Sequence, residues 1–168
     1  SWHASLIGSY ILEELLNIPV KVEYASEFRY RKTAVNGDSV VICVSQSGET
    51  ADTLAAIRKA KENGALTLGI VNVVGSSIAR ETQCGVYIHA GPEIGVASTK
   101  AFTAQVMIFN LISILLAQKK NVNIDIINPI INDIEILPGL IQSVLDHGND
   151  ILPIAQDFIN VENFLYLG

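Results

Sequence analysis

Short apolar runs alternate with segments of helical periodicity over residues 40–117 of this 168-residue chain. The runs Val40–Val44, Leu66–Val71 and Val86–His89 predict strands, and residues 50–62 and 76–80 between them predict helices. The first of these runs is almost entirely β-branched, which is typical of a strand covered on both faces. Strands separated by helices favour a parallel sheet. We therefore expect an α/β fold, a three-layer αβα sandwich with a mainly parallel sheet.

The rest of the chain is predicted mainly as helices. The whole chain of 168 residues has the length of one typical domain. The remaining predicted elements are helices over His3–Leu16, Ala97–Ala117, Pro129–Leu145 and Asp150–Ile159, and strands over Val20–Tyr24 and Asn163–Leu167.

A hydroxyl-rich turn, Ser45-Gln46-Ser47-Gly48-Glu49-Thr50, joins a predicted strand to a predicted helix. The first backbone N–H groups of a helix have no intrahelical partner, and the helix dipole adds partial positive charge there. The side chains of Ser45, Gln46, Ser47 and Thr50 can add further donors. A glycine at position 48 lets the backbone approach a ligand closely. We predict a phosphate held by neutral donors as a handle, because no Walker-type Gly-Lys-Ser/Thr follows; a simple helix cap is the alternative.

A second candidate segment, Gly91–Lys100, also follows a predicted strand. Ligands of open α/β sheets bind beyond the carboxyl ends of the strands, so this segment and the hydroxyl-rich turn are expected at the same edge. Its candidate ligand groups are the backbone of Val96 and the hydroxyl of Ser98, and a helix-capping loop is the alternative. Glu93 is expected to be an exposed loop carboxylate, with a role as acid or base as the alternative, and Gly75-Ser76-Ser77 a simple helix cap.

The composition disfavours several function classes. The net charge is −6 and no basic cluster is present, which argues against nucleic-acid binding. Cys43 and Cys84 make no disulfide framework and nothing resembles a signal peptide, so a cytoplasmic location is predicted. The apolar stretch 101–118 contains polar residues and is interpreted as a buried helix, not a membrane span. An apolar fraction of 49% predicts that part of the surface faces a partner, and favours a homodimer.

No catalytic or metal-ligating constellation can be identified in the sequence. His3, His89 and His147 are scattered, without Cys, Asp or Glu at ligand spacing. We therefore predict no metal site and no cofactor, and we identify no catalytic acid, base or nucleophile.

Three runs of the chain resemble the isomerase part of the glucosamine-6-phosphate synthase family. They are residues 41–53, residues 72–81 and residues 89–103, and residues 1–4 and 25–31 match as well. The Ser45–Thr50 motif alone marks the wider SIS (sugar isomerase) superfamily, whereas the combination is far more specific. The resemblance is strong to about Gln105 and loose beyond it.

The resemblance implies a flavodoxin-like SIS domain over residues 1–160 and the start of a second SIS domain at residues 161–168. It implies an enzyme that makes glucosamine 6-phosphate from fructose 6-phosphate and glutamine, commonly assembled as a homodimer. It also implies the substrate-binding groups: Ser45, Gln46, Ser47 and Thr50 around the phosphate, Ser1 in a neighbouring loop, and Val96 and Ser98 against the sugar.

The chain departs from the family pattern at both ends. The Cys-Gly-Thr before the equivalent of Ser1, the first strand of the sheet, the glutaminase domain and most of the second SIS domain are absent from these residues. The family's isomerising glutamate and its C-terminal lysine lie beyond Gly168, and its ring-opening histidine comes from a neighbouring subunit. We therefore expect no catalytic residue here, and a sugar-phosphate site without turnover. We also expect Phe164–Leu167 to fill the place of the missing strand, in cis or from another copy.

Two alternative functions stay open at this point. A stand-alone SIS module that senses sugar phosphates would carry an effector segment, and none is visible. Another SIS-family sugar-phosphate isomerase or deglycase would share the Ser45–Thr50 motif, but the long match through Phe102 argues against it.

Overall fold

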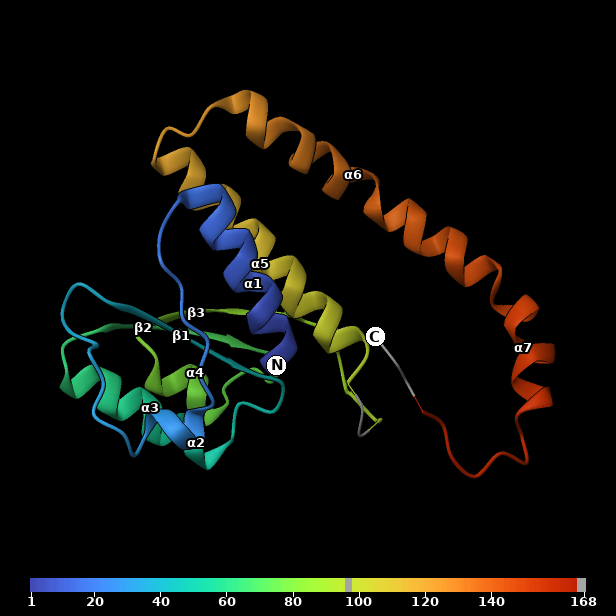
Figure 1. Cartoon of the computed structure of the whole chain (residues 1–168), viewed down its shortest axis with the longest axis horizontal. Helices are drawn as coiled ribbons and strands as arrows, with labels where there is room; N and C mark the ends of the chain where they lie inside the picture. Colours follow the sequence, from blue (N-terminus) through green and yellow to red (C-terminus); the bar gives the residue numbers. More distant parts are fainter. Residues whose placement is uncertain (96–97, 166–168) are drawn as a thin grey trace. The chain divides into compact units, whose positions relative to one another are not determined.

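The computed structural model describes residues 1–95 and 98–165. The chain divides into two compact units, Ser1–Val122 and a second that begins at Asn123, and each is described by itself. Figure 1 shows the sheet and its helices in the first unit and a helical second unit.

Three parallel strands form the sheet of the first unit, in the order β1-β2-β3. They are β1 (Val40–Ser45), β2 (Leu66–Val71) and β3 (Cys84–Tyr87). Val40 pairs with Leu66, and the register continues to the pair Ser45 and Val71. The predicted α/β fold with a parallel sheet is thus confirmed. β1 is an edge strand of the described sheet, and its burial increases from an exposed Val40 to a buried Ser45.

Helices cover both faces of the sheet (Figure 1), which confirms the three-layer arrangement. One layer holds α2, α3 and α4, and α3 contacts both β1 and β2. The other layer holds α1 and α5, which pack against each other. The bounds are α1 Trp2–Leu16, α2 Ala25–Phe28, α3 Ala51–Glu62, α4 Ser77–Glu81 and α5 Lys100–Lys119.

A buried cluster between α3, α4 and the sheet holds the edge that carries the hydroxyl-rich turn. It contains Cys43, Ile57, Val71 and Ile78, of which Ile57 and Ile78 are completely buried. Burial raises the pKa of the Cys43 thiol to about 12, whereas Cys84 on β3 is exposed. Both cysteines are free.

The pair α1 and α5 is held by close contact at a glycine. The buried face of α1 is Ala4, Gly8, Leu12 and Leu16, and the ring of Phe109 on α5 lies directly over Gly8. By length and composition α5 would suffice to cross a membrane, with a third of that stretch buried. It packs on α1 through buried residues that include Phe109.

Two predicted strands of the first unit need correction. Residues 20–24 form no strand. Alternation of apolar and polar residues indicates which side chains are buried, but it does not provide a neighbouring strand for backbone hydrogen bonds. The Val20 N–H instead donates to Glu13 Oε1, at 2.9 Å. The third strand covers Cys84–Tyr87 and not Val86–His89. It begins earlier because Gly85 fits directly against the backbone of Gly69 on β2, and His89 already has a positive φ of 50°.

The second unit consists of α6 (Ile124–Asp146) and α7 (Gly148–Asp157). Helix α6 begins five residues before the predicted Pro129, because the Asn123 side chain caps it by accepting from the Asp125 N–H. Most large apolar side chains of both helices are exposed, and α7 has no buried residue. Residues 163–165 form no strand, and the remainder of the predicted strand Asn163–Leu167 lies outside the described residues.

Candidate functional site

The Ser45–Thr50 turn has a defined internal hydrogen-bond pattern. Ser45 is buried at the end of β1, and its Oγ accepts a hydrogen bond of 3.0 Å from the Gly48 N–H. Gly48 has a φ of +70°, which turns the chain back towards α3. The Ser47 Oγ accepts from the Glu49 N–H at 3.3 Å. The serines therefore fix the turn with their acceptor lone pairs, which leaves the Ser47 hydroxyl proton for a ligand.

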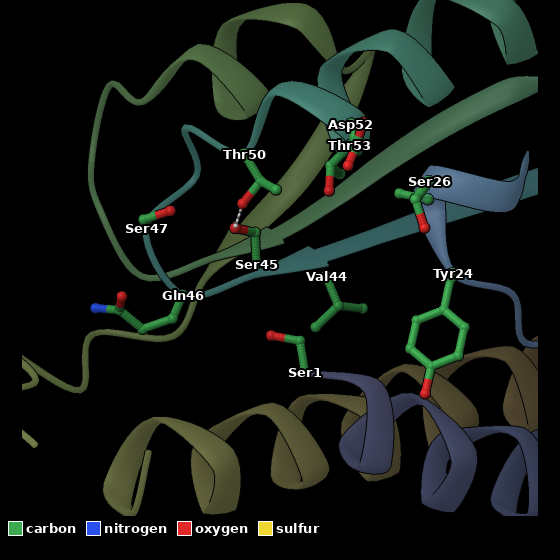
Figure 2. Close-up of a pocket in the computed structure, with 11 residues that line it drawn as sticks. Ser1, Tyr24, Ser26, Val44, Ser45, Gln46, Ser47, Thr50, Asp52 and Thr53 are labelled. Atoms are coloured by element: carbon green, nitrogen blue, oxygen red, sulfur yellow. Dashed lines mark hydrogen bonds between the residues drawn. The ribbon is translucent and has the colours of Figure 1, made fainter. Parts of the chain in front are cut away.

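The first turn of α3 is left open towards this site. Thr50 is the N-cap residue, but its side chain makes no capping hydrogen bond. Its Oγ1 lies 3.4 Å from the Ser45 Oγ (Figure 2). Since no side chain among the described residues caps α3, its first backbone N–H groups are available to an anion.

The turn lines a cavity of about 400 Å³ together with Ser1 just before α1, Tyr24 and the first residues of α2, and neighbouring residues of β1 and α3. Figure 2 shows Ser1 at the α1 side and Ser45 and Thr50 at the β1–α3 side. The lining residues are Ser1, Tyr24, Ala25, Ser26, Val44, Ser45, Gln46, Ser47, Thr50, Asp52 and Thr53. The structure thus brings together five predicted site residues: Ser1, Ser45, Gln46, Ser47 and Thr50.

Sequence reasoning missed the wall formed by Tyr24 and Ser26. The Tyr24 ring stacks on Trp2, with centroids 3.9 Å apart and planes 10° apart, which ties this segment to the start of α1. Residues 20–24 were predicted as a strand, and this prediction gives no reason to place Tyr24 at a ligand site. The one available signal was the match of residues 25–31 to the family pattern.

An ion pair balances the negative charge near the open helix end. Asp52 lines the cavity, and its Oδ1 lies 2.6 Å from the Arg29 guanidinium. The Asp52 hydrogen bond raises the pKa of Arg29, so the guanidinium stays charged. Asp52 therefore opposes an incoming anion less than an unpaired carboxylate would.

The Gly75–Ile78 segment supports the turn from behind and is more than the simple cap that was expected. The Gly48 carbonyl accepts from the Ile78 N–H at 2.9 Å, and Glu49 Oε1 accepts from the Ser77 N–H at 2.8 Å. The hydrogen bonds from Ser77 lower the pKa of Glu49. Two backbone segments from neighbouring strand ends are thereby joined, and the turn is held in one conformation.

The second predicted segment lies apart from this cavity. The Ser98 Oγ donates to Glu93 Oε2 at 3.2 Å, and Ser98 is not among the cavity lining. Glu93 also accepts from the Ala101 N–H at 3.1 Å, so it caps the start of α5 and is not a free loop carboxylate. Val96 lies outside the described residues. The assignments of Val96 and Ser98 to the sugar therefore stay predictions.

The role of Glu93 predicts acid sensitivity at the start of α5. Hydrogen bonds from the Ala101 N–H and then from Ser98 hold the pKa of Glu93 below its ordinary value. A lowered pKa in the folded state means that the stabilisation is present above the unfolded pKa and is lost as the pH falls through the folded pKa. We expect Glu93→Gln to weaken the acid dependence of stability in that window, measured by circular dichroism.

The matched control for Glu93 is Glu135→Gln at an exposed glutamate of α6. It should leave the acid transition unchanged. An unaltered acid transition in the Glu93 variant would contradict the capping role.

Comparisons with known proteins identify relatives of this chain. A profile of the SIS domain family matches residues 1–115. The chain is 52% identical to a glutamine–fructose-6-phosphate aminotransferase (isomerizing) of Chlorobaculum tepidum, over 100% of this chain and 27% of that protein. It is 45% identical to an enzyme of the same name, numbered 1, of Rattus norvegicus, over 100% of this chain and 25% of that protein. The chain thus spans about a quarter of the length of these relatives.

A solved structure shares the fold along almost the whole chain. It is the C-terminal domain of a glucosamine-fructose-6-phosphate aminotransferase from Francisella tularensis, with a TM-score of 0.86 and 36% identity. The match covers 95% of this chain and 46% of that one.

Proposed function

The chain belongs to the SIS domain family, and on this basis we propose that it binds the phosphate of fructose 6-phosphate or glucosamine 6-phosphate. We propose further that it is part of an enzyme that makes glucosamine 6-phosphate from fructose 6-phosphate and glutamine. Two relatives aligned with its entire length carry that enzyme's name, at 52% and 45% identity. The chain spans only about a quarter of their length, so the activity of the whole protein is part of the proposal.

The cavity at the start of α3 is the observation that carries the proposal. Hydroxyls of Ser47 and Thr50 and the amide of Gln46 line it beside a helix end that Thr50, its N-cap residue, does not cap with its side chain. Backbone N–H groups, hydroxyls and a helix dipole together suit a phosphate dianion without a lysine or a metal. The supporting Gly75–Ile78 segment holds these donors in place before the ligand arrives.

The rest of the lining supports a sugar attached to that phosphate. Ser1, Tyr24 and Ser26 line the same cavity as the phosphate donors. Their hydroxyl groups can donate to and accept from the hydroxyls of an extended sugar chain. We assign to them the orientation of the substrate.

The same lining supports binding without turnover by these 168 residues. Isomerisation needs a positioned base to move a proton between neighbouring carbons. Asp52 is the carboxylate of the lining, and it is held by Arg29. We therefore expect fructose 6-phosphate to bind with no glutamine-independent isomerisation, and turnover by this chain alone would contradict the assignment.

Removal of one phosphate donor tests the site. Ser47 is exposed, and its described contact is the short-range bond from the Glu49 N–H. We expect Ser47→Ala to fold normally and to raise the Kd for fructose 6-phosphate by about tenfold or more, because a hydrogen bond to a charged group contributes about 1.5–3 kcal/mol. Isothermal titration with fructose 6-phosphate and with unphosphorylated fructose measures this effect.

The control for Ser47 is Ser143→Ala, which removes an exposed hydroxyl of α6. It should bind as the unaltered protein does. Equal affinity for fructose and fructose 6-phosphate in the unaltered protein would refute a phosphate site in this turn.

We propose, in addition, that the protein forms a homodimer and is located in the cytoplasm. The outer side of α5 exposes Leu111, Leu115 and Leu116, which supports the predicted homodimer. The free thiols of Cys43 and Cys84 fit the predicted cytoplasmic location, where thiols stay reduced.

A further inference from the structure

Gln105 is a buried amide on the apolar helix α5. Its side chain is only 1% exposed, and Ala101 and Phe109 flank it on the same buried face. A buried amide is costly unless its hydrogen bonds are made. Within the part of the chain that the structure describes, Gln105 Oε1 has no hydrogen-bond partner. A side chain this costly to bury calls for a reason other than packing.

The described hydrogen bond of Gln105 leads to the cavity. Its Nε2 donates to the Ser1 Oγ at 3.1 Å, across 104 residues of sequence. Ser1 lines the cavity opposite the phosphate donors. The two residues therefore connect the interior of α5 to the ligand side of the molecule.

Ser1 is held in a way that leaves its own proton free. Its carbonyl accepts from the Ser5 N–H at 2.9 Å, so the first turn of α1 anchors its backbone. Its side chain makes no capping bond to α1. A serine hydroxyl has one donor and two acceptor positions, and Gln105 occupies an acceptor position. The Ser1 O–H can then point as a donor into the cavity.

We propose that Gln105 is a positioning residue for the sugar-phosphate site, and that it orients the Ser1 hydroxyl as a donor to the substrate. This inference rests on the proposed function of the cavity. Gln105 itself does not line the cavity, so it acts through Ser1. Pre-orientation of the hydroxyl reduces the ordering required when the ligand binds.

The substitution Gln105→Met tests the proposal with little change of volume. Methionine removes the donor to Ser1 and also removes the buried Oε1 that lacks a partner. We expect thermal stability to be maintained or increased, and the Kd for fructose 6-phosphate to rise about 3- to 10-fold. The affinity should thus fall while the stability is kept or raised, whereas loss of a purely structural contact would lower the stability as well.

A matched control is available on the same helix. Ser113 is completely buried and its Oγ also lacks a partner among the described residues, but it does not line the cavity. Ser113→Ala removes a buried polar atom in the same way and should leave the Kd unchanged.

A double-mutant cycle with Ser1→Ala decides whether Gln105 acts through Ser1. We expect Gln105→Met to have no further effect on the Kd when Ser1 is already alanine. Equal effects in both backgrounds, or none in either, would overturn the positioning role. If the unaltered protein fails to bind fructose 6-phosphate at all, the proposed function fails and not this inference alone.

Discussion

Replacing Gly48 by alanine is expected to raise the Kd for fructose 6-phosphate by about 30-fold or more. The new Cβ would lie 2.1 Å from the Oγ and 2.4 Å from the Cβ of Ser76, which is itself only 2% exposed. The residue would also be held at a φ of +70°. Left-handed backbone costs about 1–2 kcal/mol for a residue with a Cβ, and overpacking adds about 1–3 kcal/mol.

The turn is the part of the structure that must yield to this clash. Gly48 donates to Ser45 through its N–H and accepts from Ile78 through its carbonyl. If the turn shifts, both bonds are weakened and the donors around the phosphate move with it. If the cost of about 2–5 kcal/mol falls on the ligand-binding conformation of the turn, the Kd rises by about 30-fold or more, measurable by isothermal titration with fructose 6-phosphate.

Gly75→Ala separates the clash from the backbone strain. Gly75 has almost the same φ, +71°, but nothing lies within 4 Å of its added Cβ. It should lose about 1–2 kcal/mol of stability and keep most of its affinity. Equal losses of affinity in the two variants would show that the packing of Ser76 against the turn does not maintain the geometry of the site.

Gly8→Ala is expected to lower the free energy of unfolding by about 1–3 kcal/mol. Alanine is the better helix former by about 1 kcal/mol, so propensity alone predicts stabilisation. The added Cβ, however, would lie 2.4–2.6 Å from three carbons of the Phe109 ring. Phe109 is only 3% exposed, so the ring cannot swing into solvent and α1 must move away from α5. Thermal unfolding followed by circular dichroism measures the change.

The control for Gly8 is Gly139→Ala on α6. This glycine is also helical, but nothing lies within 4 Å of its added Cβ. Here helix propensity alone should determine the outcome, and we expect the free energy of unfolding to rise by up to about 1 kcal/mol. Stabilisation by both substitutions would show that α1 and α5 are not packed as described.

Local sequence signals were sufficient for most of the first unit. The strand Leu66–Val71 and the helix after Thr50 were predicted almost to the residue, because their apolar spacing and end signals lie within the segments themselves. The Ser45–Thr50 turn was found for the same reason. Its hydroxyls, its glycine and its position at a strand end are all local features.

Contacts between distant residues could not be predicted in the same way. The bond from Gln105 to Ser1 joins positions 104 residues apart, and the contact of Ser76 with Gly48 joins two separate loops. Residues 20–24 failed as a strand because a ladder requires a neighbour that alternation does not specify. Glu93 was predicted as an exposed loop carboxylate, because its capping of α5 depends on how the loop before the helix folds.

The contrast between the two cysteines has a practical consequence for measuring how the sheet opens. A thiol-specific dye should attach to the exposed Cys84 on β3 within minutes at neutral pH, without any engineered site. Cys43 is shielded, and burial raises its pKa to about 12, so it should react only when the cluster around Ile57 separates. The rate at which a second dye attaches would then report how often the cluster that supports the phosphate turn opens.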